Sequence, residues 1–220
     1  KDNNLSDAVK VDFISKRISA NKTNRMKSSD PSAQKLSQRA HQFRDTSEAS
    51  ELSFIVPRHS SENRMFLPVG ILNHKFIIND SAFALYDSPL WNMSLLISRV
   101  HLIWIATVCG KLKTDYRYSN TLGWNTFPVP TLTEKNKEDL TRCAEDILLA
   151  REAHFPATIA DLYDPEKMPE NLRDAHERND EVLERIYIGR RFKNDTERLE
   201  KLFELYVKMT EAPQKLEFNS

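Results

Sequence analysis

The sequence predicts an α+β fold, in which a small antiparallel sheet with a buried helix is followed by an all-α helical bundle. Three observations predict it. Residues 52–86 contain short runs of aromatic and branched side chains separated by Pro, Ser, Asn and Asp, residues 89–109 are almost continuously apolar, and residues 131–220 repeat apolar side chains at helical spacing. We therefore expect a sheet region first and a helical region after it.

Four short runs between residues 52 and 86 are typical of strands: LSFIVP, RMFLPVG, KFIIND and AFALYD. Turn-forming residues separate the runs, so antiparallel pairing through short connections is expected. The segment RHSSEN, at 58–63, is then predicted to form the tip of a hairpin.

The apolar run from Pro89 to Cys109 is too long for a typical strand and is predicted to form one buried helix. Gly110 follows it and suits a helix C-terminus, because glycine readily adopts the left-handed conformation that is common there. We expect this helix to be a rigid base for the charged and aromatic residues that come directly after it.

Residues 131–220 are predicted to form three amphipathic helices. The first is capped by Thr133, the second extends from Pro169 to about Gly189, and the third begins after Asn194. At the other end of the chain, the first fifty residues are polar with basic clusters and no sustained apolar face. Only one helix is predicted there, starting near Pro31 and ending at about residues 41–43.

Composition describes an ordinary soluble protein, with 40% apolar residues, 29% charged residues and a formal net charge of zero. The charge is unevenly spread, because residues 1–130 hold 17 Lys or Arg against 11 Asp or Glu, and residues 131–220 hold 15 against 21. The basic part should face a polyanion, although Glu-rich helices alone would produce the same asymmetry.

Cysteine use and hydropathy favour a cytoplasmic location. Cys109 and Cys143 lack the spacing of a disulfide framework or a zinc site. Residues 1–10 are too polar for a signal peptide, and no apolar run is long enough to cross a membrane. The first residue is not Met and the start is typical of the interior of a chain, so we expect a fragment of a longer protein.

The segment GKLKTDYRYSNTLGWNTFPVP, at 110–130, carries side chains suited to reading DNA. Arg and Lys donate to guanine edges or phosphates, Asn pairs with adenine, and Asp accepts from the cytosine amino group. Composition alone also fits a solvated helix end followed by a turn, because cations stabilise the negative end of a helix.

Catalytic motifs are missing from the sequence. The six histidines show no ligand spacing, and the four glycines form no phosphate-binding loop and no GxSxG motif. Asp115, with Lys111 and Lys113 nearby, lacks the additional spaced carboxylate of a nuclease. We therefore expect no catalytic residue, no metal and no cofactor in this fragment.

Four ordered motifs resemble the C-terminal part of the MmeI-like enzymes, single-chain bacterial proteins that join a DNA methyltransferase, a target-recognition domain and, in many members, an endonuclease. The motifs are FIVPRHSSENRMFLPVG (54–70), SLLISRVHLIWIATVCGKLKTDYRYSNT (94–121), WNTFPVP (124–130) and IADLYDPEKMPENLRDAHERND (159–180). The resemblance covers roughly residues 30–210 and implies a DNA target-recognition domain at 31–130 and a helical C-terminal domain at 131–220. Residues 1–30 depart from the family pattern and are expected to be a linker or the end of a preceding domain.

The resemblance also implies a function for the longer protein, which would be a restriction-modification enzyme or site-specific adenine N6-methyltransferase. S-adenosylmethionine would be its cofactor, held outside this fragment, which has no motif of the Asn-Pro-Pro-Tyr type. The implied partners of the fragment are double-stranded DNA and the methyltransferase domain of the longer protein.

Site residues are carried over from the resembled family onto three segments. The base-reading candidates are Arg58, Asp80, Ser81, Lys113, Asp115 and Arg117. The last three alternate, so in an extended segment they would project to one side and follow successive base pairs, although Asp115 could instead pair with Arg117. The candidates for contacts with the DNA backbone are Ser60, Ser61, Arg64, Lys111, Tyr116, Tyr118, Ser119 and Asn120.

Two other classes of function compete with this one. A helical protein-interaction module would tolerate loss of Lys113 and Arg117 and would expose an apolar face on its last helix. An RNA-binding module would stack single-stranded bases on Tyr116 and Tyr118 and would prefer single strands to duplex.

Overall fold

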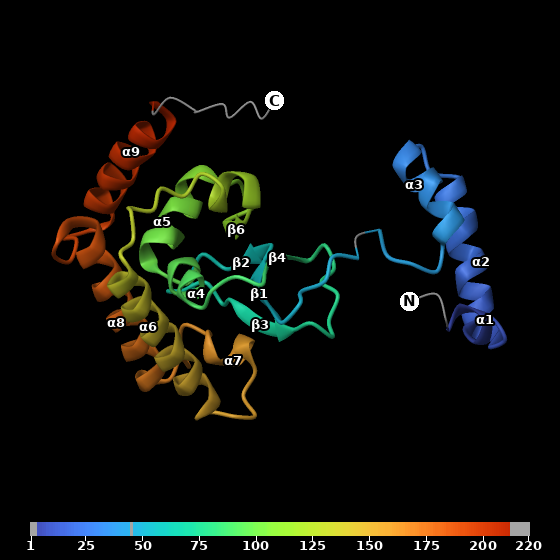
Figure 1. Cartoon of the computed structure of the whole chain (residues 1–220), viewed down its shortest axis with the longest axis horizontal. Coiled ribbons are helices and arrows are strands. Elements are labelled where there is room, and N and C mark those ends of the chain that lie inside the picture. The colour runs from blue at the N-terminus through green and yellow to red at the C-terminus, as the bar shows by residue number, and fades with distance from the viewer. Residues whose placement is uncertain (1–3, 45, 212–220) are drawn as a thin grey trace. The chain divides into compact units, whose positions relative to one another are not determined.

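The structure, a computed structural model, describes residues 4–44 and 46–211 (Figure 1). Contacts between residues divide the chain into two compact units, residues 1–47 and residues 48–220. The domain boundaries implied by the resemblance, near residues 30 and 130, stay a prediction.

The first unit is helical. It contains α1 (Leu5–Ala8), α2 (Asp12–Met26), α3 (Pro31–Lys35) and the 3₁₀ turn η1 (Leu36–Arg39). The helix expected near Pro31 begins there, where Asp30 caps it by accepting from the Ser32 N–H at 2.8 Å. It is shorter than predicted, because the last turn tightens into the 3₁₀ conformation.

Helix α2 was not predicted, because it has no apolar stripe and none of its residues is buried. Polar contacts hold it to the rest of its unit. The Arg25 guanidinium donates to the carbonyl oxygens of Leu36, Arg39 and Gln42 at 2.9, 3.0 and 2.9 Å. Side-chain hydrogen bonds therefore replace the apolar face on which the sequence prediction depends.

The second unit contains two small antiparallel sheets, which confirms the predicted fold class. The first sheet has the order β3-β1-β4, from β1 (Leu52–Pro57), β3 (Gly70–Asn73) and β4 (Ala82–Tyr86). The second has the order β2-β6-β5, from β2 (His59–Ser60), β5 (Lys111–Leu112) and β6 (Asp115–Arg117). In the first sheet β1 is central, with Phe54 opposite Ile71 on one side and Leu85 on the other.

Two of the four predicted strand runs are wrong in whole or in large part. In RMFLPVG only Gly70 is in a strand, because Phe66, Leu67 and Val69 fill the core from an irregular segment. The Val69 carbonyl accepts from the Arg151 guanidinium at 2.8 Å and joins no ladder. KFIIND lies in an irregular connection with Phe76 and Ile77 exposed.

The single helix predicted for residues 89–109 is two helices, α4 (Trp91–Leu96) and α5 (Arg99–Val108). Ser98 causes the break, because its extended backbone and its hydroxyl cap α5, accepting from the His101 N–H at 3.1 Å. Both helices are largely buried, as expected.

The helical region confirms the three predicted helices as α6 (Glu134–Glu152), α8 (Glu170–Ile188) and α9 (Asp195–Glu211), and adds the short α7 (Ile159–Leu162). Thr133 caps α6 as expected, and Gly189 ends α8 with φ of 78°. Figure 1 shows α6 and α8 side by side, with α9 continuing from the end of α8.

The described part of the second unit has two apolar cores, and the first sheet contributes to one of them. In the first core, Phe54 and Val56 of β1 pack with residues of α4 and α5, with Ile147 of α6 and with Leu172 of α8. The second core joins Trp104 of α5 to residues of α6, α8 and α9. Helix α5 therefore lies where the two cores meet. Within residues 4–44 and 46–211, no helix is long and apolar enough to span a membrane.

Candidate nucleic-acid interface

The charged segment after α5 is a hairpin rather than a loop. Strands β5 and β6 pair with Leu112 opposite Asp115, and the two residues between them make the turn. Lys113 stands in that turn with φ of 58°, so it is not part of an extended segment. The expectation that Lys113, Asp115 and Arg117 alternate along one strand is therefore wrong for Lys113. Asp115 and Arg117 do share one side of β6, and Tyr116 points to the other.

Strand β2 completes the sheet that carries these residues. His59 pairs with Arg117, and Ser60 with Tyr116. The prediction that RHSSEN forms a hairpin tip is wrong, because the chain leaves the first sheet at Pro57 and enters the second at His59. The two sheets are thus joined at Arg58.

The backbone of Arg58 brings the three predicted base-reading segments together. Its N–H donates to the carbonyl oxygen of Ser81 at 3.1 Å, and its own carbonyl accepts from the Tyr118 N–H at 2.8 Å. Asp80 and Ser81 are exposed beside β4, and Arg117 is exposed at the end of β6. Residues from three distant parts of the sequence therefore lie on neighbouring backbone segments.

A pocket of about 300 Å³ opens at this junction. Its lining includes Arg58, Phe83 and Arg117, together with Ser119. The Arg58 guanidinium carbon lies 4.7 Å from the centre of the Phe83 ring, and its buried Nε has no hydrogen-bond partner among the described residues. Two guanidinium groups with free donors at one pocket can bind the acceptor atoms of a base or a phosphate.

Asp115 is partly exposed and also makes a structural contact. Its carboxylate accepts from the Glu62 N–H at 3.3 Å, and the Glu62 carboxylate lies 3.8 Å from the Lys111 ammonium. Asp115 forms no ion pair with Arg117 within the described residues, so the alternative of an Asp115–Arg117 pair is not realised. These contacts attach the connection after β2 to the hairpin.

The eight backbone-contact candidates have different exposures. Tyr118 is 4% exposed, and its hydroxyl lies 3.4 Å from the Nε2 atom of His101. Ser60 is 5% exposed. The side chains of these two residues belong to the interior, so they are withdrawn as direct contacts. The other six are at least partly exposed: Ser61, Arg64, Lys111, Tyr116, Ser119 and Asn120.

The chain leaves the hairpin through a π-helical turn, Asn120–Trp124, capped by the Ser119 hydroxyl. Gly123 packs closely on α5, because a Cβ atom there would lie 3.1 Å from Ile105 and 3.2 Å from the Cys109 sulfur. Behind this turn His101 is fully buried, and burial lowers its pKa to about 4. The imidazole is therefore neutral at physiological pH and has a structural role.

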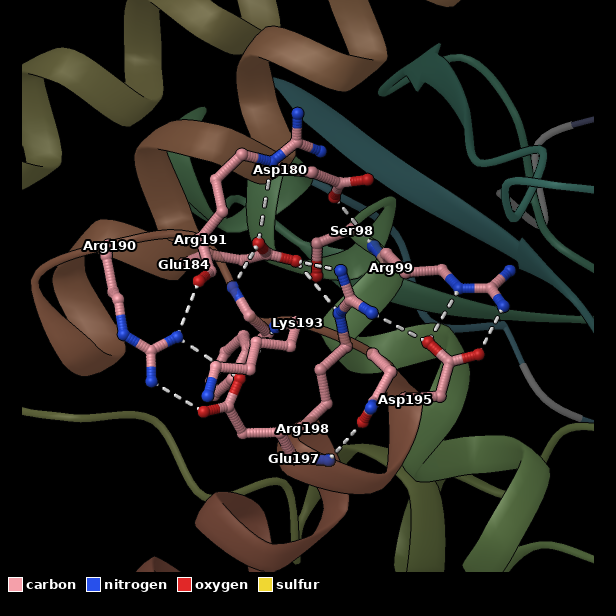
Figure 2. A network of polar contacts seen from close by, with 12 residues as sticks. Ser98, Arg99, Asp180, Glu184, Arg190, Arg191, Lys193, Asp195, Glu197 and Arg198 are labelled. Carbon is pink, nitrogen blue, oxygen red and sulfur yellow. Dashed lines mark hydrogen bonds and ion pairs between the residues drawn. The ribbon is translucent and has the colours of Figure 1, made fainter.

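A network of charged residues around the buried Asp180 and Glu184 holds the start of α5 (Figure 2). Asp180 of α8 accepts from the backbone N–H of Arg99 at 2.7 Å, and the Arg99 guanidinium donates to Asp195 of α9 at 2.7 Å. Glu184, one turn after Asp180, is fully buried and accepts from Arg198 at 2.8 Å. It also accepts from the Phe192 N–H at 3.0 Å. The network joins α5, α8 and α9.

Burial dominates the ionisation of Asp180. It raises the pKa of this carboxyl to about 7, with a further increase from Glu184, while the Arg99 N–H and the cations of Arg198 and Arg191 oppose it. The sequence analysis missed this network. Its signal was present, because Asp180 and Glu184 follow His176 at spacings of four residues on the same side as Leu172 and Leu183.

The fold and the site define a recognition module: a small two-sheet platform with an exposed hairpin, supported by a helical region. Comparisons with known proteins place it in a family. Residues 1–131 match the family model described as the MmeI target recognition domain, and residues 132–213 match that of the MmeI C-terminal domain. The chain therefore belongs to the MmeI family and comprises its target-recognition and C-terminal domains.

Two relatives support this assignment. The chain is 42% identical over 199 residues to DNA methyltransferase A of Bacillus subtilis (strain 168), a match that covers 90% of this chain and 22% of that protein. A solved structure of the type IIL restriction-modification enzyme MmeI in complex with DNA matches with a TM-score of 0.85 and 31% identity, covering 90% of this chain and 26% of that one. The chain thus spans about a quarter of the length of these relatives.

Proposed function

We propose that this chain recognises a specific sequence in double-stranded DNA. The observation that carries the proposal is the Arg58 junction, whose two backbone hydrogen bonds gather the segments of Ser81 and Tyr118 around one pocket. Arg, Asp and Lys side chains exposed on such a platform match the donors and acceptors of base edges in the major groove. The MmeI structure with DNA, whose fold this chain shares, supports the same conclusion.

Six residues are proposed to read bases, and the structure suggests a division among them. Arg117 and Asp115 project from one face of β6, and Lys113 reaches from the turn at its end. Arg58 lines the pocket. Asp80 and Ser81 directly precede β4, and the Ser81 carbonyl accepts from the Arg58 N–H. Contacts with phosphates and sugars are proposed for the backbone-contact candidates that are at least partly exposed: Ser61, Arg64, Lys111, Tyr116, Ser119 and Asn120.

The longer protein is proposed to be a site-specific DNA adenine N6-methyltransferase of a restriction-modification system. Its methyltransferase domain would bind S-adenosylmethionine and the flipped adenine, while this chain sets the sequence at which it acts. The similarity to DNA methyltransferase A and to MmeI supports the proposal. The helical region would pack against α5 and so hold the hairpin in a fixed position relative to the duplex.

Selection from a random duplex library tests the proposal. The wild-type chain should enrich one motif, and Arg117→Ala should relax the preference at one position of that motif, with a loss of about 1–3 kcal/mol for the preferred base. Arg142→Ala is the matched control, because its exposed side chain on α6 removes the same charge far from the hairpin in sequence. Failure of the wild-type chain to enrich any motif would refute sequence-specific recognition.

One observation favours a protein contact as a second candidate function. Helix α9 exposes Phe203, Val207 and Met209 at 43, 45 and 46% of their surfaces, as the interaction-module hypothesis expects. Binding of a protein domain there would be lost in Phe203→Ser with Val207→Ser and would tolerate Arg117→Ala. The two functions are thus separable by variants in different elements.

A further inference from the structure

The basic excess of the sequence lies almost entirely in the N-terminal unit. Residues 1–47 hold 10 Lys or Arg against 5 Asp or Glu, whereas residues 48–130, which include the proposed reading surface, hold 7 against 6. The helical region is acidic. Since neutralised phosphates supply most of the sequence-independent affinity for DNA, the reading surface alone carries little of the charge that this term needs.

The cations of this unit divide into structural and exposed ones. Arg25 is structural, because its guanidinium is held by three backbone carbonyl oxygens. Lys22, Lys27 and Lys35 are exposed, and among the described residues their ammonium groups have no carboxylate or hydrogen-bond partner. Their positive charge is therefore available to a ligand.

Helical spacing places Lys16 of α2 on the same side as Lys27, the residue that follows the helix. Lys16 and Lys27 are eleven residues apart, which is about three turns, so they share a face with Ala20 and Thr23 between them. Arg17 adjoins this face, with its guanidinium 5.3 Å from the Phe13 ring. Lys16 pairs with Asp12 at 2.7 Å, but both side chains are more than 70% exposed, so the pair competes weakly with a phosphate.

We propose that the N-terminal helical unit is a contact surface for the phosphate backbone of double-stranded DNA, with Lys22, Lys27 and Lys35 as phosphate-binding residues. The inference rests on the proposed DNA-binding function and adds a site to it. The unit has few apolar contacts of its own, since only Ala40 among its described residues is buried and apolar. Its surface is polar and cationic, which suits a ligand recognised by charge rather than by base sequence.

The test compares the whole wild-type chain with a triple variant, Lys22→Gln, Lys27→Gln and Lys35→Gln, which removes three positive charges. Fluorescence anisotropy with duplex DNA at several salt concentrations gives the slope of log affinity against log salt. Each lost phosphate contact should lower the magnitude of the slope by about 0.9, so the variant should lose between about 2 and 3. Affinity for the selected motif and for random duplex should fall by the same factor, about tenfold or more in 50 mM salt.

The matched control is Lys135→Gln, Lys167→Gln and Lys208→Gln, which removes the same charge from exposed sites in the helical region. It should leave the slope unchanged.

An unchanged slope in the N-terminal variant, or an equal loss in both variants, would overturn the inference, and an acidic protein surface would then be the better ligand. If the wild-type chain binds all duplexes equally but the N-terminal variant loses its slope, the inference holds while sequence-specific recognition fails. Absence of any duplex binding would overturn both.

Discussion

The two ends of helix α5 lie in opposite environments. At its start, Asp180 and Glu184 are buried, and Glu184 pairs with the Arg191 and Arg198 guanidinium groups (Figure 2). At its end the chain opens into a hairpin with strands of two and three residues and an exposed turn at Lys113. A surface this small needs a fixed support, and the π-helical turn that follows the hairpin packs on α5. Substitutions at the start of α5 are therefore expected to change stability, and substitutions in the hairpin after its end are expected to change DNA recognition.

The largest expected effect is at the buried end, in Glu184→Ala. This change leaves Arg198, whose side chain is 12% exposed, with one fewer carboxylate and removes the acceptor of the Phe192 N–H. Loss of one partner from a buried charged network typically costs about 3–5 kcal/mol. Urea denaturation should show this loss, whereas Glu177→Ala on the exposed side of α8 should change stability by less than about 0.5 kcal/mol. Similar values for the two variants would contradict a supporting role for the network.

Asp180→Asn probes the same end through pH. The pKa of Asp180 is raised to about 7 from an ordinary value of 3.8, so the folded state retains a proton that the unfolded state has already lost between these values. Its contribution to the free energy of unfolding therefore falls as pH rises from about 4 to about 7, by up to about 4 kcal/mol. Asparagine can still accept from the Arg99 N–H and has no charge to bury.

His101 acts in the opposite direction, because its pKa is lowered to about 4 from 6.5 and stability is lost as pH falls through this range. The informative quantity is thus the difference between Asp180→Asn and wild type in urea denaturation at pH 5 and pH 8. The variant should gain stability relative to wild type at pH 8. Asp174→Asn, at an exposed position of α8, should show no such gain. An equal difference at both pH values would show that Asp180 does not titrate in this range.

The contrast also explains which features could be predicted from the sequence. Helices α6, α8 and α9 were predicted because their caps and apolar stripes are local signals. The β5–β6 hairpin was not, because its strands are too short for an alternating pattern and its turn uses Lys113 instead of Gly or Asn. Helix α2 was missed because polar contacts such as those of Arg25 stabilise it.

The candidate site shows the same limit. The family resemblance supplied its residues, but exposure depends on tertiary packing, which placed Tyr118 in the core and left its neighbour Arg117 outside. The buried network was missed because charged residues spaced along a helix ordinarily face solvent, and only the second core shows that α8 is covered at Glu184.

Gly123→Ala tests the contact between the π-helical turn after the hairpin and helix α5. A Cβ atom would lie 3.1 Å from the Ile105 side chain of α5 and 3.2 Å from the Cys109 sulfur, so these side chains must give by a few tenths of an ångström. Overpacking of this kind typically costs about 1–3 kcal/mol. DNA binding should weaken together with thermal stability, because the π-helical turn that follows the hairpin packs on α5 through this contact. Gly110→Ala is the matched control, since a Cβ atom there meets nothing within 4 Å. Equal effects of the two changes would remove Gly123 from this role.

Tyr118→Phe is expected to have a smaller effect, and on stability alone. The hydroxyl lies 3.4 Å from the buried His101 Nε2, so its removal should cost about 0.5–1.5 kcal/mol. Because Tyr118 is only 4% exposed, DNA affinity measured by anisotropy should be unchanged once folding is saturated. A loss of DNA affinity without a loss of stability would return Tyr118 to the set of direct contacts.

The smallest effect on stability is expected from Arg117→Ala, one residue away. Its side chain is exposed at the end of β6, and its backbone pairing with His59 does not depend on the side chain. Stability in urea should change by less than about 0.5 kcal/mol, although the same change is expected to alter base preference. Tyr116→Ala is the comparison variant: Tyr116 packs against the first core, so this substitution should lower stability. If Arg117→Ala instead unfolded the hairpin, altered DNA binding in this variant would report folding, and the separation of recognition from stability along α5 would not hold.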